Sequence, residues 1–228
     1  MVTTTQTAAS VALRATMAAR TEELFRRAGA LREGHFRLKS GRHSDRYLEK
    51  FQVLQFPDIT SELCAMLAGF GRGADGGTSV ELVAGPTTGG VILAFETARQ
   101  LGVRSLFAEE VRRAGESHRE FRRGFAIRPG ERALLVDDIL TTGGSLAAML
   151  PAVERLGGEV VRAAVLVDRS GGQDSLVSPD SGRTYPLEAL WRLELATWEA
   201  GERCAGCAAG LPLEEPGSGG AAGGAGTA

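Results

Sequence analysis

The fold of this chain is indicated most clearly by the stretch Ala133-Leu-Leu-Val-Asp137-Asp138-Ile139-Leu140-Thr141-Thr142-Gly143-Gly144-Ser145. An apolar run typical of a buried strand leads into two carboxylates, and a turn of threonines, glycines and a serine follows. Glycines let backbone N–H groups crowd around an anion, hydroxyls add donors, and the N-terminus of a following helix favours negative charge. Two carboxylates that precede such a turn can accept hydrogen bonds from the hydroxyls of a ribose whose 5-phosphate lies in the turn. A divalent cation could lie between the carboxylates and the ribose. The stretch therefore predicts a phosphoribosyl-binding site.

Two further turns follow apolar strand patterns in the same way. Gly85-Pro86-Thr87-Thr88-Gly89-Gly90 comes after residues 80–84, and Asp168-Arg169 comes after residues 160–167. Ligands of open parallel sheets lie beyond the carboxyl ends of the strands, so the three turns should converge on one crevice. The Gly-Pro turn is suited to pyrophosphate, which its amide groups and threonine hydroxyls would bind. An ordinary loop before a helix is the alternative interpretation.

Strand and helix patterns alternate along most of the chain. We expect helices over residues 8–30, 57–70, 91–101 and 145–156, a hairpin over 36–51, and strands over 80–84, 104–108, 132–136 and 160–167. Pro151 should kink the last helix unless that helix begins later. The alternation predicts an α/β fold, a mainly parallel twisted sheet flanked by helices, with a small N-terminal hood of helix and hairpin.

We divide the chain into a hood (1–56), a core (57–200), a C-terminal extension (201–215) and a disordered tail (216–228).

Composition narrows the function classes. The chain has 228 residues, 43% of them hydrophobic, which is enough for one good core. Its 26 basic and 28 acidic residues are mixed along the chain and give a net charge of −2, so no broad field attracts nucleic acid. The N-terminal residues lack a signal-peptide core and no long apolar run follows, so we expect no membrane partner and a cytoplasmic location.

The chain has three cysteines, too few for a disulfide framework. Cys204 and Cys207 form a C-x-x-C motif, which is half of a zinc knuckle or a redox pair by spacing. The sequence reveals no second pair of ligands. For the two cysteines of this motif, three interpretations remain: a structural or incidental role, a metal shared across a dimer, or a disulfide.

The motif from Ala133 to Ser145 resembles the signature of the type I phosphoribosyltransferases, enzymes that use phosphoribosyl pyrophosphate (PRPP) as ribosyl donor. A P-loop is excluded because the chain has neither G-x-x-x-x-G-K-[ST] nor a strand followed by G-x-G-x-x-G. Together with Gly34-His-Phe-Arg-Leu-Lys39-Ser-Gly-Arg-His-Ser44, Gly85–Gly90 and Val167-Asp168-Arg169, the motif is similar in order and spacing to the orotate phosphoribosyltransferases. The resemblance covers residues 34–172 and implies transfer of phosphoribose from PRPP to orotate in pyrimidine biosynthesis, with Mg²⁺ and a homodimer.

The resemblance also implies roles for individual residues. Lys39, Tyr47, Thr141 and Arg169 would contact orotate, since a planar guanidinium suits its carboxylate. A surface lysine at position 39 and an ion pair of Arg169 with Asp168 are the alternatives. PRPP would be held by Asp137, Asp138, Ile139, Leu140, Thr141, Thr142, Gly143, Gly144 and Ser145, by Thr87, Thr88 and Gly89, and by Arg112, Arg113 and His118. We expect Asp137, Asp138, His118 and Arg113 to be catalytic, and Asp137 and Asp138 to hold Mg²⁺ indirectly through Mg-PRPP.

The polar segment Glu109–Gly124 is expected to be a loop that acts as a lid. On closing, it could bring Arg112, Arg113, His118 or Arg119 over the leaving pyrophosphate. A solvated hairpin with exposed charge is the alternative interpretation. Members of the family usually carry a lysine near the position of Glu116, which reaches the neighbouring active site of the dimer. This lid has no lysine. Three consequences of the missing lysine remain possible: arginine supplies the positive charge, the enzyme has a low rate, or it uses another base.

Two other functions remain under consideration. One is a phosphoribosyltransferase for a purine or another base such as uracil, which Arg169 argues against because a purine has no carboxylate. The other is a non-catalytic PRPP-responsive regulator that binds RNA, which would need a basic face that the net charge does not indicate.

Overall fold

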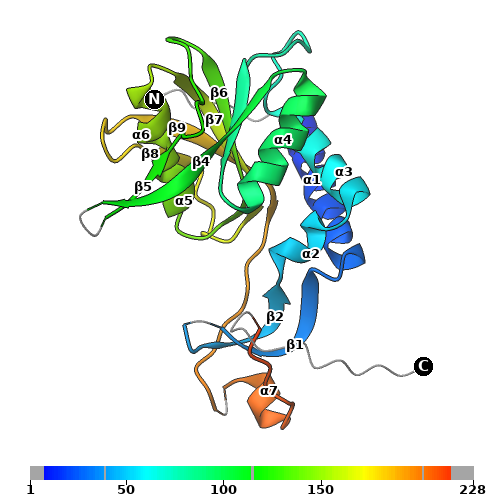
Figure 1. Ribbon diagram of the computed structural model, residues 1–228. Helices are drawn as coiled ribbons and strands as arrows, with labels where there is room; N and C mark the ends of the chain where they lie inside the picture. The colour runs from blue at the N-terminus through cyan, green and yellow to red at the C-terminus, as the bar shows by residue number, and fades with distance from the viewer. Residues whose placement is uncertain (1–7, 39, 114–115, 202, 217–228) are drawn as a thin grey trace.

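The protein is described by a computed structural model that covers residues 8–38, 40–113, 116–201 and 203–216 (Figure 1). Seven strands form one sheet in the order β5-β4-β3-β6-β7-β9-β8. The inner strands β4 (Arg104–Arg113), β3 (Leu82–Pro86), β6 (Arg132–Leu140), β7 (Glu159–Asp168) and β9 (Thr184–Arg192) are parallel. The edge strands β5 (Glu116–Glu120) and β8 (Ser175–Val177) are antiparallel to their neighbours. The predicted fold class is confirmed.

Helices cover both faces of the sheet. On one side lie α1 (Ala8–Arg27), α3 (Pro57–Gly69) and α4 (Gly89–Leu101), and on the other lie α5 (Gly144–Ala147) and α6 (Met149–Arg155) (Figure 1). Alternate residues of each strand face opposite sides: Leu134 and Val136 join the core under α1, α3 and α4, whereas Ala133 and Leu135 join the core under α5 and α6. This double burial explains why the strands read as continuous apolar runs.

The N-terminal hairpin lies outside this sheet. Its strands β1 (Leu31–Arg37) and β2 (His43–Leu48) form a separate antiparallel pair, followed by the short helix α2 (Lys50–Leu54). The C-terminal segment leaves the sheet after β9 and runs down to this hairpin, where it forms the short helix α7 (Ala205–Ala208) and then pairs with β1 through Glu214 (Figure 1). We call β1, β2 and residues 196–216 the small lobe.

The structure corrects several expected elements. Strand β6 continues through Asp137 and Asp138 to Leu140, because its last residues pair with β7. The predicted helix over residues 145–156 is two helices that meet at Ala148, so Pro151 falls in the first turn of α6, where its missing N–H costs no helical hydrogen bond. Strands β8 and β9 were not predicted.

The expected lid loop is also different. It is a hairpin made by the end of β4 and by β5, in which Glu110 pairs with Arg119 and Val111 with His118. The domain boundaries remain a prediction, and the tail proposed to be disordered lies, apart from Pro216, outside the described residues. None of the described helices is long and apolar enough to cross a membrane.

Candidate active site

Two glycine-containing turns meet where the strand order of the sheet reverses. Strand β3 leads through Gly85–Gly90 into α4 and on to β4 at one side, and β6 leads through Thr141–Ser145 into α5 and on to β7 at the other. Since β3 and β6 are neighbours, the two turns lie side by side at the carboxyl ends of their strands. A switch point of this kind is the usual ligand crevice of an open α/β sheet.

The acid pair lies at this switch point and is buried. Asp137 is 8% exposed and Asp138 is 2% exposed. The Asp137 carboxylate accepts a hydrogen bond from the Asp138 amide at 2.9 Å, and Asp138 Oδ1 accepts one from the Ile139 amide at 2.7 Å. Lys50, the first residue of α2, donates to Asp138 Oδ1 at 2.9 Å. The chain thus supplies one cation for two adjacent carboxyl groups.

Burial and the neighbouring carboxylate change the pKa of Asp137. Burial, and then the charge of Asp138, raise the pKa of Asp137 to about 7, although the Asp138 amide and Lys50 act in the opposite direction. A divalent cation fits this donor set, because Asp138 Oδ2 is buried and accepts no hydrogen bond from the described residues. Carboxylate oxygens are the ligands that Mg²⁺ prefers.

The turn after β3 packs closely against the acid pair. A Cβ on Gly89 would lie 2.1 Å from Asp138 Oδ2, and a Cβ on Gly85 would lie 2.2 Å from the carbonyl oxygen of Gly90. Only glycine fits at both places, so the tight turn and its contact with Asp138 require these residues. In the second turn Gly143 has a φ of 76°, which glycine adopts without strain.

Arg119 connects the two turns. From β5 its guanidinium donates to Thr87 Oγ1 at 3.1 Å and to Ser145 Oγ at 3.3 Å. Arg119 is therefore a lid cation that contacts both proposed phosphate-binding turns. Arg119 was among the lid residues that we expected from the sequence to close over the leaving pyrophosphate, but its contacts with both turns were not predicted.

The other lid residues lie elsewhere. His118 is on the opposite face of β5 from Arg119, since neighbouring residues of a strand alternate. Arg112 is mostly exposed and lies 3.8 Å from Glu110. Arg113 is the last residue of β4. The roles predicted for Arg112, Arg113 and His118 therefore remain predictions.

Arg169 and Tyr47 approach one another from different parts of the fold. Arg169 follows β7, and its amide donates to the carbonyl oxygen of Leu140 at 2.8 Å. Burial, and then the charge of Glu49, raise the pKa of Tyr47, and the positive charge of Arg169 opposes this rise. Burial lowers the pKa of Arg169.

The guanidinium of Arg169 makes no ion pair with any residue in the described ranges. The alternative pairing with Asp168 is wrong: Asp168 instead accepts from Ser170 Oγ at 2.6 Å and lies 3.5 Å from Arg192 Nε. A cleft of about 520 Å³ opens beside Arg169 and is lined by residues 168–172 and 192–195. A half-buried cation without a carboxylate partner suits an anionic ligand. Lys39, expected in the same subsite, lies outside the described residues.

A larger cleft of about 700 Å³ lies away from this chemistry. It runs between α3, α4 and β4, and its lining is mostly apolar, with Ile92, Phe95 and Phe107 among its residues. Phe95 is 63% exposed and Ile92 is 42% exposed. None of the acidic or threonine site residues lines this cleft, so it is separate from the proposed catalytic crevice.

A phosphoribosyltransferase domain is indicated by the reversed strand order, the two turns and the buried acid pair. Residues 60–184 match the family model described as the phosphoribosyl transferase domain. The orotate phosphoribosyltransferase of Pelotomaculum thermopropionicum is 48% identical over 195 residues, which covers 86% of this chain and 94% of the relative. That of Desulforamulus reducens is 45% identical over 196 residues, with the same coverage. The crystal structure of orotate phosphoribosyltransferase from Aeropyrum pernix matches with a TM-score of 0.60 at 26% identity, over 75% of this chain and 92% of that one. The chain belongs to the orotate phosphoribosyltransferase family, and the predicted resemblance is confirmed.

Proposed function

We propose that the protein transfers the phosphoribosyl group of PRPP to orotate, forming orotidine 5′-monophosphate and pyrophosphate for pyrimidine biosynthesis. The carbon–oxygen bond between the anomeric carbon and pyrophosphate breaks, and a bond from a ring nitrogen of orotate to that carbon forms. The observation that carries the proposal is the buried acid pair between two glycine turns. Arg169, whose guanidinium has no ion-pair partner within the described part of the chain, follows the next strand, β7.

Each part of the crevice has a task in this reaction. The carboxylates of Asp137 and Asp138 accept hydrogen bonds from the ribose hydroxyls and stabilise positive charge that develops on the sugar. The turn over residues 141–145 holds the 5-phosphate, and Thr87, Thr88 and Gly89 hold the pyrophosphate through hydroxyl and amide groups. Lys50 limits the charge of the acid pair before the substrate binds, because it contacts Asp138 directly.

Mg²⁺ is the cofactor we propose. When bound with PRPP, it would neutralise charge on the departing pyrophosphate, and the carboxylate oxygens of Asp137 and Asp138 would hold it indirectly. The buried, unpartnered Asp138 Oδ2 supports this assignment.

Orotate recognition rests on Arg169, with Tyr47, Thr141 and Lys39 as further contacts. A planar guanidinium can bind the orotate carboxylate with two parallel hydrogen bonds. A purine base has no carboxylate to pair, and this disfavours the purine alternative. The regulator alternative would need a basic surface, whereas the chain has a net charge of −2.

We also propose that the protein is a homodimer that shares its lid. The apolar cleft with Ile92 and Phe95 would be covered by a second copy. His118 faces away from the turns of its own chain, which supports a role for His118, Arg112 and Arg113 in the partner's active site. A cytoplasmic location remains part of the proposal.

The test is the loss of orotate absorbance when PRPP and Mg²⁺ are added to the purified protein. Turnover with orotate, and its loss in the double variant Asp137→Asn/Asp138→Asn, would support the proposal. Turnover with a purine base instead of orotate would favour the purine alternative, and RNA binding without any turnover would favour the regulator.

A further inference from the structure

The small lobe brings together four metal-ligating side chains that are far apart in the sequence. His35 comes from β1 and His43 from β2, while Cys204 caps the N-terminus of α7 and Cys207 lies within this helix. One ligand atom of each residue lies within 4.8 Å of all the others. We call these four residues the histidine–cysteine cluster.

Three nitrogen–sulfur distances in the cluster are close to those of a tetrahedral metal site. His35 Nε2 lies 3.5 Å from Cys204 Sγ and 3.6 Å from Cys207 Sγ, and His43 Nδ1 lies 3.2 Å from Cys207 Sγ. A zinc tetrahedron with bonds of about 2.0–2.1 Å to nitrogen and about 2.3 Å to sulfur has nitrogen–sulfur edges of about 3.5 Å. The two ring nitrogens are 2.8 Å apart and would need to separate by about 0.5 Å, since the nitrogen–nitrogen edge is about 3.3 Å.

The second nitrogen of His35 is engaged in the way that zinc ligands require. Its Nδ1 lies 3.0 Å from the carbonyl oxygen of Leu211, to which it can only donate. The proton is therefore on Nδ1 in the neutral ring, and the lone pair of Nε2 points into the cluster. A ligating histidine almost always donates its other N–H to such an acceptor, which fixes the tautomer and the ring orientation.

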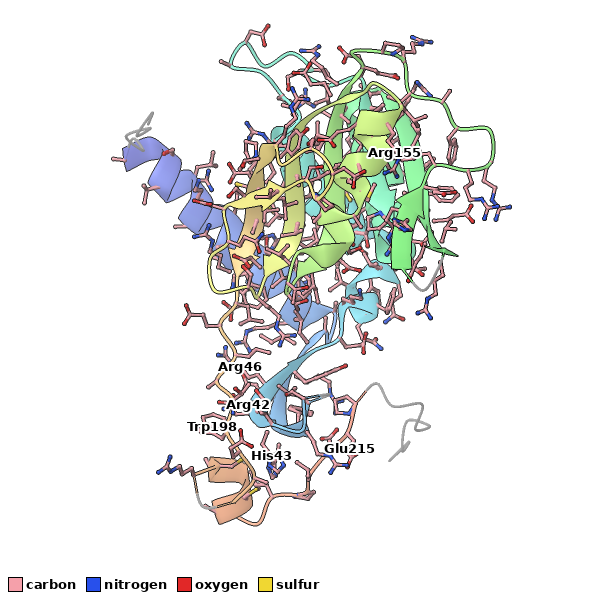
Figure 2. The ribbon with its side chains drawn as sticks, turned by 90° about the vertical axis from the view of Figure 1, so that its left-hand side faces the viewer. Arg42, His43, Arg46, Arg155, Trp198 and Glu215 are labelled. Atoms are coloured by element: carbon pink, nitrogen blue, oxygen red, sulfur yellow. The ribbon has the colours of Figure 1, made fainter. Side chains whose placement is uncertain are left out.

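The backbone holds the ligands in place from both sides. His43 and Trp198 exchange two backbone hydrogen bonds of 2.8 and 2.9 Å, and Glu214 donates to the carbonyl oxygen of His35 at 2.8 Å. Figure 2 shows His43 and Trp198 at the end of the hairpin that is remote from the sheet, beside the C-terminal helix. A Cβ on Gly206 would lie 2.5 Å from the His35 ring, so the residue inside the C-x-x-C motif must be glycine for the cysteines to reach the histidines.

The small lobe has little apolar core at this end. His35, His43 and Cys204 are buried, whereas the large buried apolar residues belong almost entirely to the two cores of the sheet. Small units without a sufficient hydrophobic core commonly depend on a metal or a disulfide. By binding a metal, the four ligands of the histidine–cysteine cluster would stabilise this end of the small lobe.

We propose that His35 Nε2, His43 Nδ1, Cys204 Sγ and Cys207 Sγ bind one structural Zn²⁺ that fastens the C-terminal segment to the N-terminal hairpin. Two thiolates and two neutral imidazoles balance the charge of Zn²⁺, which suits a buried site. The two-sulfur, two-nitrogen tetrahedral set selects zinc over magnesium or calcium. Four protein ligands close the coordination shell and leave no position for a substrate, so the metal is structural and independent of the proposed transfer reaction.

The first experiment measures the metal content of the full-length protein without an affinity tag. The protein is produced in zinc-supplemented medium, desalted without chelator and analysed by mass spectrometry for metals and for intact mass. We expect about one zinc per chain and all thiols reduced. Zinc far below one per chain, iron in its place, or an intact mass that shows a Cys204–Cys207 disulfide would each overturn the proposal.

Variants locate the metal. Cys207→Ser and His43→Ala should each lower the zinc content at least about tenfold. Cys64→Ala is the matched control, because this thiol is buried in α3 near the carbonyl oxygen of Leu93 and lies outside the cluster. A control that loses zinc as fully as Cys207→Ser would contradict the assignment.

Cobalt substitution keeps the test independent of variant folding. In the wild-type protein Co²⁺ should give the visible absorption of a tetrahedral site and a thiolate-to-cobalt charge-transfer band. Protein that binds Co²⁺ without the thiolate band would refute ligation by Cys204 and Cys207.

Discussion

Replacement of Asp137 by asparagine should stabilise the folded protein at neutral to alkaline pH while it removes activity. Asp137 is buried beside Asp138, and its pKa is raised from 3.8 to about 7. Asparagine has nearly the same shape and cannot ionise. Its side-chain oxygen can still accept the hydrogen bond that Asp137 accepts from the Asp138 amide at 2.9 Å.

The magnitude follows from the two pKa values. The folded chain holds the Asp137 proton more tightly than the unfolded chain, so this contribution to stability is fully present below pH 3.8 and is lost as the pH rises through about 7. Between these values the free energy of unfolding falls by about 1.4 kcal/mol per pH unit. Over roughly three units the loss reaches at most about 4 kcal/mol, and the asparagine variant avoids it.

Urea unfolding at pH 5 and pH 8 measures the effect. The stability advantage of Asp137→Asn over wild type should grow by about 2–3 kcal/mol from pH 5 to pH 8. Asp174→Asn, at an exposed position, is the matched control and should differ from wild type by no more than about 0.5 kcal/mol at both pH values. An advantage that stays constant or shrinks between pH 5 and pH 8 would refute the proposed cost of the buried charge.

Three further outcomes test the rest of the site. Arg169→Ala should raise the KM for orotate about 10- to 100-fold, with a much smaller change for PRPP, because it removes a charge-assisted contact; equal changes in steady-state kinetics would contradict carboxylate recognition. Arg119→Ala should lower kcat/KM for PRPP about 10- to 100-fold, since its guanidinium joins the two turns, whereas the control Arg123→Ala, whose partner is Glu109, should change it little; similar losses in both would show that only general lid charge matters. Phe95→Glu should convert a dimer into a monomer in light scattering, because a charge would enter an apolar interface; an unchanged mass would place the interface elsewhere.

Local patterns predicted the elements that depend on local burial and turn chemistry. The apolar runs before Asp137 and before Gly85 must be strands covered on both faces, and only glycines permit the turns that follow them. Strand ends were less predictable. Strand β6 continues to Leu140 because β7 offers it partners, and β4 continues into the lid because β5 folds back on it.

Contacts between distant segments escaped the sequence. Lys50 follows a hairpin and carries no motif, yet it is the cation that contacts Asp138. The C-x-x-C motif was visible, but its two histidines belong to a hairpin at the other end of the chain. Neither pairing has a periodic or spacing signal, because each arises only when separate elements are packed together.

The α/β fold, the positions of the glycine-containing turns and the family could be predicted from the sequence, because they follow from burial patterns and from a continuous motif whose chemistry is local. Only the tertiary structure decided that Arg119 joins the two turns, that Arg169 has no acidic partner among the described residues, and that His35 and His43 meet Cys204 and Cys207. The physical reason is the same in each case. The charge balance of a site and the ligands of a metal depend on distances through space, which the order of residues along the chain does not specify.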